Sequence, residues 1–181
     1  MEELMSLNIS RENMITFLLT TPMFEDLDPH DIGEISHIVE TLKFEPGDTI
    51  FSEGTPGDGW YALYSGEVEV TKQTNGNERT INTLEPHSCF GEIAVLDGLP
   101  RSATIRATKE TVVLRVPLEK FRDLIEQNHI VAYKLIKHMA VLLASRQRAN
   151  TEALSKLLLA NELANIHEGI LEIVGDSSTR E

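Results

Sequence analysis

Turn-forming residues recur through the middle of this chain at intervals that leave room only for short strands. Eight of the eleven glycines lie between Gly47 and Gly98, and they separate β-prone runs at roughly ten-residue intervals. Asn75 and Gly76 stand between two such runs, and this pair tolerates the positive φ angles of a tight hairpin. The spacing predicts an antiparallel β-sandwich or barrel over residues 43–117, and not an alternation of strands and helices.

Helical patterns flank this β-prone region on both sides. Ser10 is placed to cap a first helix, and Asp28 with Pro29 to open a second. Pro117 opens another helix, and no proline follows it. We therefore predict a mainly β fold with flanking helices: a domain over residues 1–150, with helices 10–20, 28–42, 117–127 and 129–150, then a helical extension over 151–174 and a disordered tail over 175–181.

Composition restricts the setting of such a fold. The chain of 181 residues is 41% hydrophobic, enough for one domain with a sizeable core. Its longest apolar stretch, residues 139–144, is far short of the ~20 residues that cross a bilayer, and no signal segment precedes it. The single cysteine, Cys89, cannot form an internal disulfide, which fits a reducing compartment. We expect a cytoplasmic protein with no membrane segment, in which Cys89 is a small buried side chain.

Charge is distributed unevenly along the chain. The net charge is −13, and residues 1–117, with 8 basic and 20 acidic side chains, contribute −12 of it. This balance argues against a nucleic-acid partner, because phosphate contacts need clustered Lys and Arg. An anionic ligand bound in this region would need a dedicated positive group. The basic side chains of residues 128–150 are interpreted as packing against the acidic domain or a partner subunit.

Residues 90–104, FGEIAVLDGLPRSAT, combine the groups that suit a small anion carrying a sugar. Gly91 permits close approach of a ligand to the backbone, and residues 92–96 can form a short helical turn with free N–H groups. The Arg101 guanidinium can bind a phosphate oxygen through charge-assisted hydrogen bonds. Glu92, an acceptor when ionised, suits a sugar hydroxyl.

This loop closely resembles the phosphate-binding cassette of the cyclic nucleotide-binding domain, a family shared by bacterial catabolite activator proteins, protein kinase A regulatory subunits and cyclic-nucleotide-gated channels. The resemblance extends over about residues 15–150 and implies that residues 43–117 form an antiparallel β-roll, a jelly-roll-like double-stranded β-helix. The family pattern, FGE-hydrophobic-A followed by PR-small-AT, is met at Phe90, Gly91, Glu92, Ile93, Ala94, Pro100, Arg101, Ser102, Ala103 and Thr104.

The resemblance implies a role for each residue of the site. Glu92 would bind the ribose 2′-hydroxyl and Arg101 the cyclic phosphate. Ser102 and Ala103, with backbone amides of residues 91–94, would complete the phosphate site. We expect cyclic AMP as the default ligand ahead of cyclic GMP, because a hydroxyl at the position of Ser102 occurs in binders of either.

Two further residues are placed near the base by counting along the family pattern without gaps. These are Arg146 and Gln147, for which a solvated helix face or a dimer contact is the alternative interpretation.

The function implied is that of a stand-alone cyclic-nucleotide sensor acting on an effector protein, and not that of an enzyme. The six histidines lack the His-x-His of a metal-binding β-barrel enzyme, so neither a metal nor a cofactor is expected. Related transcription regulators carry a helix-turn-helix, for which the roughly thirty residues after Asn150 leave no room. The alternative is a nucleotide-independent dimerisation or protein-interaction module that retains the fold.

The helical third of the chain carries two apolar stripes. Sixteen residues separate Leu143 from Leu159, which at about 100° per residue puts the stripes roughly 160° apart. We expect a break near Asn150 and Thr151. The alternative is a continuous helix that packs one face on its own β-domain and the other on a second subunit. In both cases we expect homodimerisation through these helices. The stripes are Ile136, Met139, Ala140 and Leu143, and then Leu159, Leu163, Ile166, Ile170 and Ile173.

Overall fold

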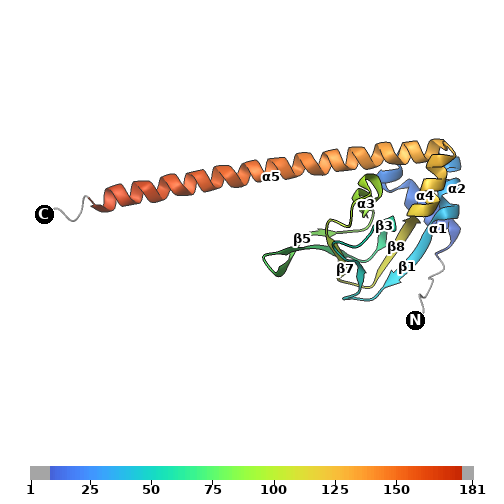
Figure 1. Cartoon of the computed structure of the whole chain (residues 1–181), viewed down its shortest axis with the longest axis horizontal. Helices are drawn as coiled ribbons and strands as arrows, with labels where there is room; N and C mark the ends of the chain where they lie inside the picture. Colours follow the sequence, from blue (N-terminus) through green and yellow to red (C-terminus); the bar gives the residue numbers. More distant parts are fainter. Residues whose placement is uncertain (1–8, 177–181) are drawn as a thin grey trace. The chain divides into compact units, whose positions relative to one another are not determined.

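Two antiparallel sheets dominate the computed structural model, which describes residues 9–176 (Figure 1). One sheet has the strand order β1-β8-β3-β6 and the other β2-β7-β4-β5, so the predicted β-roll is confirmed. The strands are β1 (Glu40–Phe44), β2 (Thr49–Phe51), β3 (Gly59–Ser65), β4 (Val68–Thr74), β5 (Asn77–Leu84), β6 (Cys89–Phe90), β7 (Thr104–Ala107) and β8 (Thr111–Pro117). The helices are α1 (Arg11–Leu19), the 3-10 helix η1 (Pro22–Phe24), α2 (Pro29–Ile38), α3 (Glu92–Asp97), α4 (Leu118–Glu126) and α5 (Ile130–Asp176).

The described residues divide into two units, one ending at Met139 and the other beginning at Ala140. The first holds both sheets and helices α1 to α4, and the second consists of most of α5. None of the helices within residues 9–176 is both long and apolar enough to cross a membrane.

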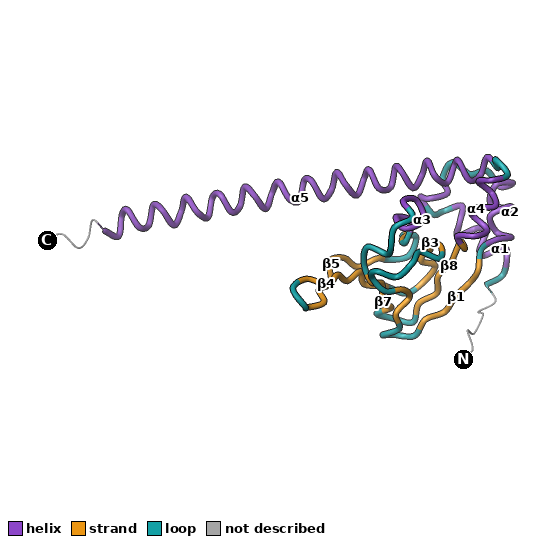
Figure 2. Tube along the Cα trace, in the orientation of Figure 1, coloured by secondary structure: helices purple, strands orange, loops and turns teal. Residues whose placement is uncertain are grey.

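Strand β3 is buried on both of its faces. Tyr61 and Leu63 face the core between the sheets, where they meet Val68, Phe90, Ile105 and Val113. On the other face, Trp60 is 0% exposed and its ring lies 5.7 Å from that of Phe24 in η1. Figure 2 shows α1, α2 and α4 gathered on one side of the strands. Each fully buried apolar side chain stabilises the fold by roughly 1.5–3 kcal/mol. The side chains on the two faces of β3 therefore hold the helical layer and the β-roll together.

Local turn and cap chemistry is as the sequence predicts. Asn75 and Gly76 have φ angles of 52° and 79° between β4 and β5. Ser10 accepts a hydrogen bond from the Asn13 backbone, and Asp28 forms a capping box at the start of α2. Cys89 is a buried thiol.

The predicted helix over residues 28–42 is wrong at its C-terminal end. Helix α2 stops at Ile38, and Val39 already has an extended conformation, with φ −73° and ψ 137°. The next five residues form β1, which pairs with β8 from Glu40 opposite Arg115 to Phe44 opposite Thr111. Leu42 therefore packs against the sheet core instead of extending the helix face. Long-range pairing overrides a local helical pattern here.

The predicted break near Asn150 is also wrong, and the helix is continuous; that its second face packs on another subunit stays a prediction. Helix α5 runs unbroken from Ile130 to Asp176. Thr151 does not cap a new helix, because its hydroxyl donates to the Gln147 carbonyl one turn earlier, at 3.0 Å. The predicted tail begins too early, since residues 175 and 176 are helical, and residues 177–181 lie outside the described residues.

The first apolar stripe is only partly as predicted. Met139 is buried, but Ala140 is exposed, and the buried face of α5 in the first unit is centred on Leu135. In the second stripe, Leu159, Leu163 and Ile166 are exposed, and the side chains of residues 170 and 173 lie outside those described.

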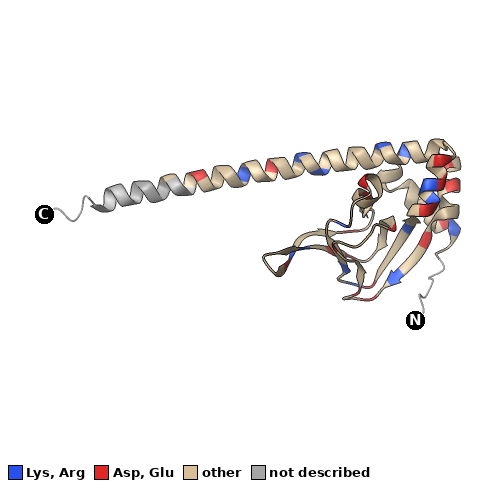
Figure 3. Cartoon of the chain, in the orientation of Figure 1, with Lys and Arg blue, Asp and Glu red and all other residues tan. Residues whose placement is uncertain are grey.

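Charged residues of both signs are interspersed along the strands (Figure 3). The Glu78 carboxylate accepts from the Thr71 hydroxyl and pairs with Arg106 at 3.2 Å. The Thr71 hydrogen bond, and after it Arg106, lower the pKa of Glu78 below its ordinary value of 4.5 against the opposing effect of burial.

We predict that Glu78 stabilises the fold at neutral pH and not in acid. A folded-state pKa below the unfolded value gives stability that is present above pH 4.5 and lost as the pH falls through the folded pKa. Glu78→Gln should therefore lower the thermal midpoint at about pH 7, and the difference from the wild type should vanish towards about pH 3. Glu85→Gln is the control, because the Glu85 side chain has no ion pair or hydrogen bond within residues 9–176. A difference independent of pH would contradict this explanation.

Candidate nucleotide-binding site

The loop between β6 and β7 is held by two glycines in left-handed conformations. Gly91, with φ 81°, precedes α3, and Gly98, with φ 70°, follows it. The predicted helical turn is thus present as α3. Beyond it, the backbone N–H of Arg101 donates to the Thr55 carbonyl, and the Arg101 carbonyl accepts from Gly54, both at 2.8 Å. These two bonds fasten the end of the loop to the segment before β3.

The Arg101 guanidinium is directed into the protein, and its side chain is 1% exposed. Nη1 donates to the Gly91 carbonyl at 2.7 Å, and Nη2 donates to the Gly59 carbonyl at 2.7 Å and to Asp58 Oδ1 at 2.8 Å. Its Nε is buried and has no hydrogen-bond partner among the described residues. A guanidinium has five N–H donors, so this one retains capacity for an acceptor that the chain does not supply.

Aromatic rings form the wall beside this cation. The Arg101 Cζ lies 4.0 Å from the centre of the Phe51 ring and 5.7 Å from that of Tyr61. Tyr61 stacks on Phe90 with ring centres 5.3 Å apart. Burial, and then the Asp58 carboxylate, raise the pKa of Tyr61 to about 12, so its hydroxyl stays protonated and donates to Asp58.

Two charged residues of this network were missed at the sequence level. Asp58 pairs with Arg101 through Oδ1 and with Arg115 through Oδ2, at 2.8 Å in both cases. Arg115 also pairs with Glu40 at 3.1 Å. An acidic residue in the Gly/Pro-rich segment before β3 is the sequence signal that could have identified Asp58. Nothing local pointed to Arg115, which reaches the network through the pairing of β8 with β3.

The other predicted residues lie on the same loop with different exposures. Glu92 is 1% exposed on the first turn of α3, and Ala94 is buried close to Gly57. The Ile93 side chain is exposed, Ser102 is exposed and Ala103 is half-buried.

Arg146 and Gln147 lie on α5 in the second unit. Their contact with a base stays a prediction.

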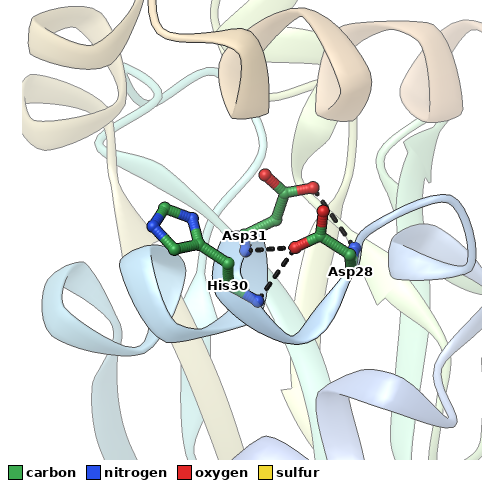
Figure 4. A group of neighbouring side chains, drawn as sticks. All are labelled: Asp28, His30 and Asp31. Atoms are coloured by element: carbon green, nitrogen blue, oxygen red, sulfur yellow. Dashed lines mark hydrogen bonds between the residues drawn. The ribbon is translucent and has the colours of Figure 1, made fainter.

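One group of potential metal-ligating side chains within residues 9–176 gathers at the start of α2, where ligand atoms of Asp28, His30 and Asp31 lie within 4.8 Å of one another (Figure 4). Asp28 Oδ1 accepts from the backbone N–H groups of His30 and Asp31, at 2.9 Å each. Asp31 accepts from the Asp28 backbone and pairs with Lys134. Helix capping and this ion pair account for the cluster, so we assign no metal to it.

We predict that Gly91 cannot be replaced without disturbing Arg101. A Cβ on Gly91 would lie 2.7 Å from Arg101 Nη1, whereas a Cβ on Gly98 would meet nothing within 4 Å. Since φ is positive at both glycines, alanine should cost about 1–2 kcal/mol of backbone strain at either. Gly91→Ala should lower the free energy of unfolding by roughly a further 1–2 kcal/mol in urea titrations. Equal losses in the two variants would show that Arg101 does not restrict this position.

Comparisons with known proteins agree on the kind of domain that carries this loop. A family profile described as the cyclic nucleotide-binding domain matches residues 41–128. The chain is 36% identical over 109 residues to a cAMP-dependent protein kinase regulatory subunit of Emericella nidulans, which covers 60% of this chain and 26% of that protein. It is 24% identical over 169 residues to a CRP-like cAMP-activated global transcriptional regulator of Mycobacterium tuberculosis, covering 93% of this chain and 74% of the regulator.

Solved structures give the same result. The catabolite activator protein of Thermus thermophilus superposes with a TM-score of 0.66 at 30% identity, covering 75% of this chain and 62% of that one. The regulatory subunit of a cAMP-independent protein kinase A from Trypanosoma brucei superposes with a TM-score of 0.65 at 25% identity, covering 76% and 47%. The chain spans about a quarter of the length of the kinase regulatory subunits that it matches. Residues 41–128 are therefore a cyclic nucleotide-binding domain.

Proposed function

We propose that this chain is a regulatory sensor that binds a cyclic nucleotide, cyclic AMP ahead of cyclic GMP, through residues 90–104. Arg101 would bind the cyclic phosphate and Glu92 the ribose 2′-hydroxyl. Ser102, Ala103 and the backbone of residues 91–94 would complete the phosphate site. The chain's own chemistry would be binding and conformational change, without catalysis.

The observation that carries the proposal is the buried, incompletely paired guanidinium of Arg101. Its side chain is 1% exposed in a region with a net charge of −12, and its Nε lacks a partner among the described residues. A buried cation is costly unless its hydrogen bonds are satisfied, so the unpaired donors of Arg101 favour an acceptor that comes from outside the chain. A phosphate oxygen would accept a charge-assisted hydrogen bond from the donors that remain.

The preference for cyclic AMP is supported by the names of the relatives, several of which are called cAMP-dependent or cAMP-activated. One similar structure belongs to a kinase subunit named cAMP-independent. This observation favours a second candidate function, that of a nucleotide-independent dimerisation or interaction module. Direct binding measurements separate the two.

We further propose that ligand binding is passed to the helices after β8 and from there to an effector protein, and that two copies associate through their C-terminal helices. Between residues 154 and 166 of α5, six large apolar side chains are each more than half exposed. They are Leu154, Leu157, Leu158, Leu159, Leu163 and Ile166. Apolar side chains at this density on a helix favour burial against another helix. The buried thiol of Cys89 is compatible with the cytoplasm as the setting.

We expect cyclic AMP to raise the thermal midpoint of the protein. A ligand at ~100 times its dissociation constant adds roughly 2.7 kcal/mol of stability. For a chain of this length, the midpoint should rise by about 2–4 °C per kcal/mol. Differential scanning fluorimetry with cyclic AMP, cyclic GMP and 5′-AMP measures this effect, and 5′-AMP controls for general binding of phosphate and adenine.

The decisive variant is Arg101→Met, which should abolish the shift. Arg79→Met is the matched control, because Arg79 is exposed on β5 and its variant should keep the full shift. If millimolar cyclic nucleotides give no shift in the wild type, or an equal shift in Arg101→Met, the interaction-module function is correct instead.

Association through α5 is tested by light scattering after gel filtration. The wild type should have twice the 20.2 kDa mass of the chain. Leu159→Glu combined with Leu163→Glu should reduce it to a monomer, because both side chains lie on one exposed face. A monomeric wild type, or a dimer that survives the double substitution, would refute this interface.

A further inference from the structure

The Asp58 carboxylate is divided between two guanidinium groups. Oδ1 pairs with Arg101 and Oδ2 with Arg115, at 2.8 Å in each case. The Tyr61 hydroxyl donates to Oδ1 as well, at 3.2 Å. The Asp58 side chain is 55% exposed while that of Arg101 is 1% exposed, so the carboxylate lies at the surface end of a buried cation.

Arg115 is held rigidly in place for this contact. It lies in the middle of β8, paired in register with Glu40 of β1 on one side and Tyr61 of β3 on the other. Its Nη2 also donates to the Asp58 carbonyl at 3.0 Å, and its Nη1 donates to Glu40 at 3.1 Å. The same Asp58 carbonyl accepts from Leu118, the first residue of α4. Arg115 thus fixes both the carboxylate and the backbone of Asp58.

We propose that Arg115 is a positioning residue that sets the affinity of Arg101 for an anionic ligand, by drawing the Asp58 carboxylate away from it. The inference rests on the proposed function, since it concerns how the cyclic phosphate gains access to Arg101. Arg115 itself need not touch the ligand.

The physical reason is competition between two anions for one cation. A phosphate that approaches Arg101 competes with Asp58 for the guanidinium and is also repelled by the carboxylate. Arg115 weakens both effects, because it shares the carboxylate and neutralises its charge over a 2.8 Å contact. Without Arg115, Asp58 would have only Arg101 as its cationic partner, and the ligand would have to displace an undivided ion pair.

A purely structural role for Arg115 makes a different prediction. The Arg115–Glu40 pair ties β8 to β1, so loss of Arg115 destabilises the sheet on either explanation. Only the positioning role makes the effect on ligand binding depend on the charge of Asp58. Lys120 provides a matched control, because it pairs with the other oxygen of Glu40 at 3.7 Å, at the far end of the same chain of charges.

The first test is calorimetric titration with cyclic AMP. Arg115→Met should weaken binding about tenfold, a size typical of coupled neighbouring charges. Asp58→Asn in the Arg115→Met background should restore affinity to within about twofold of Asp58→Asn alone. Arg115→Lys should restore part of the loss, and Lys120→Met should bind like the wild type. Circular dichroism confirms that each variant is folded. An unchanged affinity in Arg115→Met, or a loss that Asp58→Asn does not relieve, overturns the inference.

The second test needs no ligand and separates this inference from the proposed function. In urea unfolding, a double-mutant cycle of Arg101→Met and Asp58→Asn measures the coupling between these two side chains. The coupling should be larger when residue 115 is methionine than when it is arginine. If the wild type binds no cyclic nucleotide, the proposed function fails while this cycle still decides the role of Arg115. An equal or smaller coupling in the Arg115→Met background overturns the inference.

Discussion

A guanidinium almost out of contact with solvent is the constraint on which the β-roll depends. Burying a cation without partners costs several kcal/mol, so Arg101 needs acceptors, and it obtains them from Gly91, Gly59 and Asp58. These acceptors come from the end of β6 and from the start of β3, more than thirty residues apart in the chain. Only the antiparallel pairing of β3 with β6, in which Tyr61 lies opposite Phe90, brings them together. The binding loop and the sheet therefore depend on each other.

Strand β3 connects this loop to the helices. On its inner face Tyr61 stacks on Phe90 and lies beside the Arg101 guanidinium. On its outer face Trp60 packs against Phe24 of the helical layer. A close-packed strand transmits small displacements instead of absorbing them. A change in the partners of Arg101 would thus reach η1 through β3, and α4 through the Asp58 carbonyl that accepts from Leu118.

The comparisons assign the fold to one family, but the function of a member depends on individual residues. Relatives with this fold include kinase subunits named cAMP-dependent and one named cAMP-independent, as well as transcriptional regulators. Because one fold accompanies several functions, the fold alone does not assign nucleotide binding, and Arg101 with its surroundings is the feature that supports it. Asp58 and Arg115 matter for the same reason, since an ion network around Arg101 could adjust the affinity for an anion without any change of fold.

Local chemistry in the sequence was sufficient for much of the architecture. The glycine spacing predicted an antiparallel β-sandwich or barrel, the Asn75–Gly76 pair its hairpin, and residues 90–104 the loop with Gly91 and Arg101. Each of these depends on backbone conformations or side-chain types that act within a few residues. One error arose where a distant partner decided the outcome: residues 40–42 are drawn into β1 by β8.

By itself, then, the sequence determined the class of fold, the loop of residues 90–104 and the identity of its central cation. Only the tertiary structure decided that Arg101 is turned inward against Phe51 and shares Asp58 with Arg115. The reason is physical: strand register juxtaposes Asp58, Arg101 and Arg115 across long stretches of chain, and no local pattern records which charges will meet. Helix α5 shows the converse, because intact local hydrogen bonding carried it through Asn150, where a change of apolar face had suggested a break.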